Sequence, residues 1–203
     1  MIAIIDYGVG NLFSLKSSLA MIGKEAVVTS DRGVIASADH VILPGVGAFG
    51  DAADKLRNTG MWEAVTDYAQ SGRPVLGICV GMQLMFDISF EYGTHKGLSL
   101  IPGEVRSIRE AGCEGLKIPH MGWNSLEYRK KSALYEGIAE GEFVYFVHSF
   151  SAFGCGEYTN AVCEYGVTLT ASVERDNIYA VQFHPEKSGR TGLAILNNFC
   201  KIR

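Results

Sequence analysis

Short apolar segments alternate with segments of helical spacing through the first half of this 203-residue chain, and this alternation limits the possible fold more than any other feature. The apolar segments are residues 2–5, 26–28, 41–43 and 74–78, and the helical patterns are residues 12–22 and 62–69. Each apolar segment is too short for a helix and is apolar on both faces, as buried strands are. The order therefore predicts a parallel sheet with helices on both of its faces.

The second half of the chain has a different rhythm. Strand-like segments occupy residues 143–147, 158–163, 168–173 and 178–183, and residues 193–200 have the pattern of a closing helix. Strands that follow one another without a crossover helix pair antiparallel. We therefore expect an α/β fold with a mixed, mainly parallel central sheet, and a single domain over residues 1–203.

Composition excludes several classes of protein. A formal net charge of −4 leaves no basic excess for binding nucleic acid. The chain begins without a basic leader, and it has no apolar run near the roughly 18 residues that a membrane span needs. Its five cysteines form no CxxC pair, which argues against a disulfide framework and against a zinc site. We expect a cytoplasmic protein with reduced thiols and no bound metal.

Residues 45–50 match the dinucleotide-binding pattern G-x-G-x-x-G and follow a predicted strand. Such a site also needs an acidic residue at the end of the next strand, about 20 residues further on. Asp67 stands at that distance but belongs to a helical pattern, so the motif gives little support for a dinucleotide cofactor. Pro44 before the motif favours an extended loop with free backbone N–H groups.

Cys79 stands between Gly77 and Gly81, directly after a predicted buried strand and before another apolar segment. This is the pattern of a nucleophile elbow, with cysteine in the place of serine. A helix that begins there would favour the thiolate through its partial positive charge. The alternative is a small buried apolar residue, which is the commonest fate of a cysteine. This turn alone supports the two interpretations about equally.

A cysteine nucleophile requires a base and a group that orients the base. His184 ends a predicted strand and precedes Pro185, which keeps the backbone at His184 extended. In an extended segment Glu186 points to the same side as His184 and can fix its tautomer. We expect His40 and His95, which lie in turn-like segments, at the surface.

Three segments resemble the signatures of class I (triad-type) glutamine amidotransferases: PGVG, GICVGMQ and VQFHPEKS. Within that family the nearer resemblance is to the glutaminase subunits of imidazole glycerol phosphate synthases. It runs from residue 2 to about residue 200 and includes IDYGVGNL, LPGVGAFGDA, GICVGMQLMF, GLSLIPG, IPHMGWN, YFVHSF and VQFHPEKSG, in that order. The resemblance implies the class I amidotransferase fold, with its flavodoxin-like core.

The resemblance also implies roles for individual residues. It implies Cys79 as nucleophile, His184 as base and Glu186 as the orienting carboxylate. The implied contacts to glutamine and its oxyanion are Gly45, Val46, Gly47, Val80, Gln83, His148, Ser149 and Phe150. The implied partner contacts are Trp123, Tyr145 and Lys187, with residues 120–124 as a loop near that interface. Ser149-Phe150 departs from the Thr-Tyr or Ser-Tyr of many relatives, and no role follows for Cys113, Cys155, Cys163 and Cys200.

The function implied is glutamine hydrolysis to glutamate and ammonia, without a cofactor. The ammonia would pass to a (β/α)8-barrel cyclase, in a heterodimer that forms imidazole glycerol phosphate and AICAR in histidine biosynthesis. One alternative is a glutaminase for the amidation of surface sugars, whose site motifs would be the same. A catalytically silent module and a peptide hydrolase are further alternatives. A silent module is disfavoured because Cys79, His184 and Glu186 are all present. A peptide hydrolase is disfavoured by the glutamine-site motifs.

Overall fold

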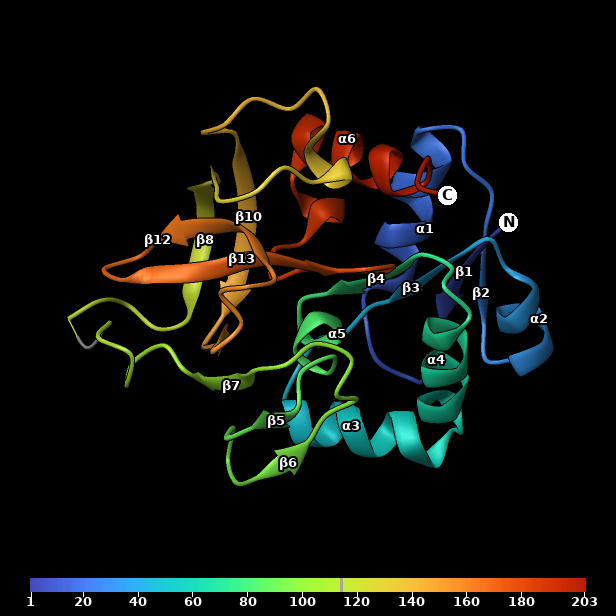
Figure 1. The fold of residues 1–203 in the computed structure, drawn as a ribbon, viewed down its shortest axis with the longest axis horizontal. Coiled ribbons are helices and arrows are strands. Elements are labelled where there is room, and N and C mark those ends of the chain that lie inside the picture. The colour runs from blue at the N-terminus through green and yellow to red at the C-terminus, as the bar shows by residue number, and fades with distance from the viewer. Residues whose placement is uncertain (114) are drawn as a thin grey trace.

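A central sheet with helices on both faces forms the body of the protein (Figure 1). The computed structural model describes residues 1–113 and 115–203. Within these residues the central sheet has eight strands in the order β2-β1-β3-β4-β14-β13-β12-β9. The strands are β1 (Ile2–Ile5), β2 (Ala26–Thr29), β3 (His40–Leu43), β4 (Val75–Ile78), β9 (Glu127–Tyr128), β12 (Thr159–Glu164), β13 (Thr168–Arg175) and β14 (Ile178–Val181).

The pairing in this sheet confirms the predicted mixed fold. Strands β2, β1, β3, β4 and β14 are parallel, and β13, β12 and β9 continue the sheet in antiparallel pairs. The parallel part has the doubly wound order 2-1-3-4-5 of flavodoxin-like proteins. Strands β1, β4 and β14 are buried along their whole length, as expected for strands covered on both faces.

Two groups of helices cover the sheet. In Figure 1, α1 (Leu12–Met21) and α6 (Gly189–Phe199) lie above it, and α3 (Phe49–Asn58) and α4 (Met61–Gln70) lie below it. Helix α2 (Arg32–Ser37) packs against α4. No sequence pattern indicates α2, because this six-residue helix buries only Ile35 and so has no apolar periodicity.

Two small sheets lie beside the antiparallel part. One pairs β8 (His120–Ser125) with β10 (Phe143–His148). The other has the order β11-β7-β5-β6, with β5 (Ile88–Ser89), β6 (His95–Lys96), β7 (Glu104–Ser107) and β11 (Phe150–Phe153). Residues 120–124 are therefore not the expected loop, because each of them has a partner on β10. The remaining elements are single turns: α5 (Val80–Gln83), η1 (Ala133–Tyr135) and η2 (Pro185–Lys187).

The register of three neighbouring parallel strands determines where the site forms. Leu43 on β3 pairs with Gly77 on β4, and Ile78 at the end of β4 pairs with Val181 at the end of β14. The residues that follow these strands therefore leave the sheet at one edge, side by side. Ligands of doubly wound sheets bind at this carboxyl edge.

Candidate active site

Cys79 lies in the tight turn between β4 and α5. Its backbone is left-handed, with φ 55° and ψ −112°, and its N–H donates to Val181 O at 2.8 Å. A non-glycine residue in such a conformation is strained and needs support from its surroundings. The turn is also crowded, because a Cβ on Gly81 would lie 1.9 Å from Leu43 O and a Cβ on Gly77 would lie 2.8 Å from Gly81 O. The geometry is that of the predicted nucleophile elbow.

The helix after Cys79 is shorter than the sequence suggested. Helix α5 covers only Val80–Gln83, and the chain then continues in turns. One turn of helix has few aligned peptide dipoles, so the expected effect of a helix terminus on the thiol is small. Stabilisation of a thiolate must therefore come from neighbouring side chains.

His184 and Glu186 form a hydrogen bond of 2.8 Å between Nδ1 and Oε1, with only 2% and 4% of their side chains exposed. The expectation that the whole segment is extended is wrong for Glu186. His184 is extended, but Pro185 begins the 3-10 turn η2, since its fixed φ suits the first position of such a turn. That turn brings the carboxylate to the imidazole.

The His184 ring is arranged to accept a proton at its other nitrogen. Glu186 can only accept, so Nδ1 carries the hydrogen of the 2.8 Å bond. Among the described residues, His184 Nε2 and Glu186 Oε2 are buried side-chain atoms without a hydrogen-bond partner. Burial lowers the pKa of His184, but interactions with Cys79 and Glu186 outweigh it and raise the pKa to about 9. The imidazolium is thus stabilised between a thiol and a carboxylate.

The other four cysteines have surroundings that disfavour a thiolate. All five cysteines are free thiols. Burial raises the pKa of Cys163 to about 12 and that of Cys200 to about 11. Burial also raises the pKa of Cys113 and of Cys155. Since only thiolates are effective nucleophiles, Cys79 is the best candidate.

A cavity of about 300 Å³ opens above Cys79 and His184. Of the eight predicted contacts to glutamine, seven line this cavity: Val46, Gly47, Val80, Gln83, His148, Ser149 and Phe150. Gly45 lies just behind, where a Cβ would meet Gly81 N at 2.5 Å. The residues implied by scattered motifs therefore lie around one site.

Glu91 lines the same cavity, and sequence reasoning missed it. Its Oε2 accepts a hydrogen bond of 2.7 Å from Phe49 N–H, and burial raises the pKa of its carboxyl. No sequence pattern marks it, because it follows the two-residue strand β5. Pro119 and Val147 also line the cavity and were missed.

The G-x-G-x-x-G match has a packing explanation. Gly50 belongs to α3, and a Cβ on it would lie 2.7 Å from the His95 ring. Asp67 lies on α4 and pairs with Arg32 at 3.1 Å. His95 is half-buried against Phe49 and Gly50 and is therefore not the surface residue we expected.

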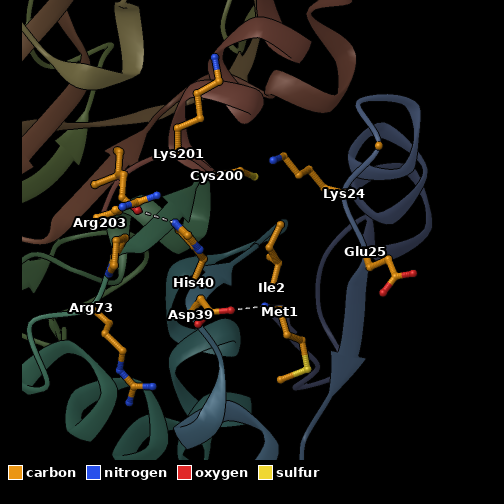
Figure 2. A pocket seen from close by; sticks show the side chains of 13 residues that line it. Met1, Ile2, Lys24, Glu25, Asp39, His40, Arg73, Cys200, Lys201 and Arg203 are labelled. Carbon is orange, nitrogen blue, oxygen red and sulfur yellow. Dashed lines mark hydrogen bonds and ion pairs between the residues drawn. The ribbon is translucent and has the colours of Figure 1, made fainter.

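A larger cavity, of about 800 Å³, lies at the opposite end of the parallel strands. Figure 2 shows the basic side chains Lys24, Arg73 and Lys201 around it, and His40 at its base. His40 is half-buried, contrary to expectation, and its Nε2 lies 2.9 Å from Ile202 O. The cysteine of this cavity is Cys200, whose pKa is raised by burial. His40 is bonded to the Ile202 carbonyl and Asp39 pairs with the Met1 amino group, so the described residues here do not form the linked thiol, imidazole and carboxylate of the smaller cavity.

The three residues that the resemblance implies as partner contacts lie together. The Trp123 and Tyr145 rings pack edge to face at 6.1 Å between centroids, and Lys187 Nζ lies 5.8 Å from the centre of the Tyr145 ring. Trp123 is 55% exposed, and Met121 and Phe143 on the same two strands are also exposed. Val147, further along β10, lines the cavity. An exposed apolar face thus extends from the β8–β10 ribbon to the site.

Comparison with known proteins gives consistent results. The family described as "Glutamine amidotransferase class-I" matches residues 3–202. The imidazole glycerol phosphate synthase subunit HisH of Syntrophotalea carbinolica is 48% identical over 204 residues, which cover 98% of each chain. The subunit of the same name from Geobacter metallireducens is 49% identical over 203 residues, which cover 98% of this chain and 96% of that protein.

Solved structures agree on the fold. The crystal structure of a glutamine amidotransferase has a TM-score of 0.75 at 18% identity and covers 98% of this chain and 100% of its own. The structure of PurLQS from Thermotoga maritima has a TM-score of 0.76 at 18% identity, and the match covers 98% of this chain and 96% of that chain. In the part of the chain that the structure describes, no helix is long and apolar enough to cross a bilayer.

Proposed function

Because this chain belongs to the class-I glutamine amidotransferase family, we propose that it is the glutaminase subunit of an imidazole glycerol phosphate synthase. The observation that carries the proposal is that the buried Cys79 and His184 line a cavity of about 300 Å³, with Glu186 bonded to His184 behind it. The cavity is of the right order for one amino acid. The full-length similarity to HisH subunits supports this synthase rather than a sugar amidotransferase.

The first half of the reaction forms a covalent intermediate. The Cys79 thiolate attacks the side-chain carbonyl carbon of glutamine, and the carbonyl electron pair moves to oxygen. When this pair returns, the C–N bond breaks and the His184 imidazolium gives its proton to the departing nitrogen. Ammonia leaves, and a γ-glutamyl thioester remains on Cys79.

The second half releases glutamate. A water molecule attacks the thioester and gives a proton to His184 Nε2, whose ring is held through Nδ1 by Glu186. The C–S bond breaks, the thiolate forms again and glutamate leaves. Glu186 accepts the hydrogen of His184 Nδ1 and stabilises the imidazolium, which is consistent with the raised pKa of His184.

Backbone donors stabilise the oxyanion in both halves. The Val80 N–H, in the first turn of α5, has no acceptor within the helix and is free to donate. A second N–H would come from residues 45–47, where Gly47 has φ 88° and the Tyr7 hydroxyl donates to the preceding Pro44 carbonyl at 2.7 Å. One such donor is typically worth ~3–4 kcal/mol.

The two charged ends of glutamine have complementary groups in the cavity. The Glu91 carboxylate can accept from the substrate ammonium while its Oε2 remains bonded to Phe49 N–H. The backbone of residues 148–150 also lines the cavity, and its N–H groups would bind the substrate carboxylate. Burial makes these contacts stronger than they would be in water.

A synthase subunit needs a partner that uses the ammonia. We propose a (β/α)8-barrel cyclase that binds Trp123, Tyr145 and Lys187 in a heterodimer. The exposed Met121, Trp123 and Phe143 support a protein contact there, since aromatic residues and methionine are enriched at interfaces. Because Val147 joins this face to the cavity, ammonia released at Cys79 would enter the covered interface rather than bulk water.

The direct test is glutamate release by Cys79→Ala together with the barrel partner and its ligand. We expect at least a roughly 10⁴-fold loss, because the covalent route is removed. Cys79→Ser should lose nearly as much, since the serine hydroxyl is far less acidic than a thiol. Cys200→Ala is the matched control and should keep full activity. Wild-type release from Cys79→Ala would refute the proposed function.

A further inference from the structure

Gln182 is completely buried at the end of β14, directly before Phe183 and His184, and the reaction described above does not use it. Its side-chain amide has two neighbours. Gln83 Nε2 lies 3.1 Å from Gln182 Oε1, and Gln182 Nε2 lies 3.7 Å from Cys79 Sγ. A buried amide is costly unless its polar atoms are bonded, so both contacts matter.

The direction of these hydrogen bonds follows from one backbone group. The Phe150 carbonyl can only accept, and the Gln83 amide approaches it at 3.0 Å, so the group there must be the NH₂. The same NH₂ is the group that faces Gln182, so the Gln182 atom opposite it must be the carbonyl oxygen. Rotating both amides by 180° would place oxygen against the Phe150 oxygen. The Gln182 NH₂ is therefore the end that faces the sulfur of Cys79.

A second group of side chains holds the Phe150 carbonyl in place. His148 Nδ1 lies 2.9 Å from this oxygen, so His148 carries its hydrogen on Nδ1. His148 Nε2 then accepts from His120 Nδ1 at 3.0 Å. The Phe150 carbonyl therefore accepts hydrogen bonds from both His148 and Gln83. Because this carbonyl is held in place, it determines the orientation of both glutamine amides.

We propose that Gln182 is a hydrogen-bond donor to the sulfur of the nucleophile, held in this orientation by Gln83 and the Phe150 carbonyl. An N–H aimed at sulfur stabilises the thiolate more than the thiol. The proton that Cys79 loses passes to His184. Gln182 then stabilises the Cys79 thiolate, and His184 holds the proton as an imidazolium. The hydrogen bond itself is independent of the substrate, whereas its contribution to turnover rests on the proposed glutaminase function.

Gln182 should affect the chemical steps and not substrate binding. It does not line the cavity, whereas Gln83 does. Negative charge returns to the sulfur when the thioester breaks down, so the donor also favours departure of the thiolate. Loss of the donor should therefore lower kcat and leave KM unchanged.

The first test measures the rate at which iodoacetamide alkylates Cys79, as a function of pH, in the full chain without partner or glutamine. Mass spectrometry of the Cys79 peptide separates it from the four other thiols. In Gln182→Met, of similar length, we expect the alkylation profile to move up by about one pH unit, or roughly 10-fold less thiolate near neutral pH. Gln182→Glu keeps the shape of the side chain, and a larger upward shift is expected because a carboxylate then faces the sulfur.

The control is Asn198→Leu, which removes a buried amide that donates to Leu134 O and Glu136 O on another face of the protein. Its alkylation profile should match that of the wild type even if its thermal stability is lower. Profiles that are unchanged in both Gln182 variants would overturn the proposal, and so would an equal shift in the control.

The second test measures glutamate release by Gln182→Met in the complex with the barrel partner. We expect kcat to fall about 10-fold with an unchanged KM, in line with the change in thiolate. A raised KM with an unchanged kcat would overturn the catalytic part of the proposal. If the alkylation profile moves but Cys79→Ala still hydrolyses glutamine, the hydrogen bond stands and the proposed function fails.

Discussion

Three buried histidines differ in charge because their neighbours differ. His184 has a carboxylate and a thiol beside it, and its pKa is raised to about 9. Burial lowers the pKa of His120 to about 4 and that of His148 to about 3. Their hydrogen bonds go to each other, to Asn124 and to the Phe150 carbonyl. The first histidine is thus suited to hold a proton, and the other two are suited to remain neutral.

Replacing Glu186 tests the role of its charge. Glu186→Gln keeps the volume and an oxygen for His184 Nδ1 but removes the charge that favours the imidazolium. We expect a loss in kcat of about 10²–10⁴-fold with little change in thermal stability. Steady-state glutamate release in the complex measures this, with Glu63→Gln on the exposed face of α4 as control. Full activity of Glu186→Gln would show that another group orients His184.

The neutral pair His120 and His148 predicts a pH dependence of stability. Both folded pKa values lie below the unfolded value of about 6.5, so the unfolded chain binds more protons between pH 6.5 and pH 4. The free energy of unfolding should therefore fall as the pH decreases through this window. His184 stays protonated in the folded chain throughout this window, and it adds little to the slope below about pH 5.5, where the unfolded chain is protonated at this position too.

Urea unfolding at pH 4.5 to 6.5 measures this slope. In His120→Gln the slope should decrease by up to about 1.4 kcal/mol per pH unit, which corresponds to one proton. Asn124→Ala removes a neighbour of His120 at 3.3 Å but no titrating group, so it should lower stability while keeping the wild-type slope. An unchanged slope in His120→Gln would mean that this histidine is protonated in the folded protein.

At the scale of elements, the sequence predicted best where strands are buried. The parallel strands β1, β3, β4 and β14 are short apolar segments, and the common edge of the last three places Pro44, Cys79 and His184 together. The strands β5 to β9 were missed, because two-residue strands and half-exposed ribbons have no clear period. Glu91 was missed for the same reason, since long-range packing alone brings it to the cavity.

The β8–β10 ribbon carries a prediction about assembly. Trp123 on β8 lies opposite Tyr145 on β10 and is 55% exposed. We therefore expect its side chain to add little to the stability of the folded chain but much to the free energy of partner binding. Trp123→Ala should weaken partner binding by about 30-fold, which corresponds to a contribution of ~2 kcal/mol. Titration calorimetry with the proposed barrel partner measures this.

The control for Trp123→Ala is Met21→Ala, at the end of α1 and 75% exposed. It should leave the affinity for the partner unchanged. Equal binding of the Trp123→Ala variant and the wild type would show that the partner binds elsewhere.

At the scale of the whole molecule, the chain divides into a sheet that holds the nucleophile and a ribbon that faces outward. The cavity lies between them, with Cys79 from β4 and Val147 and His148 from β10. This arrangement explains how one chain could release ammonia directly into a contact with a second protein. It also implies that the chemistry of this chain and that of its partner are separable.

The most direct test of this central claim compares two nitrogen sources, glutamine and ammonium, for product formation by a complex that carries Cys79→Ala. The variant complex should make no product from glutamine, because the thioester cannot form. It should still make product from added ammonium salts, and best at high pH, where more free ammonia is present. Product from ammonium but not from glutamine is the result that we predict. Failure with both nitrogen sources, in a complex shown to be assembled, would contradict the account, because Cys79 would then serve the partner's reaction itself or the partner would be a different enzyme.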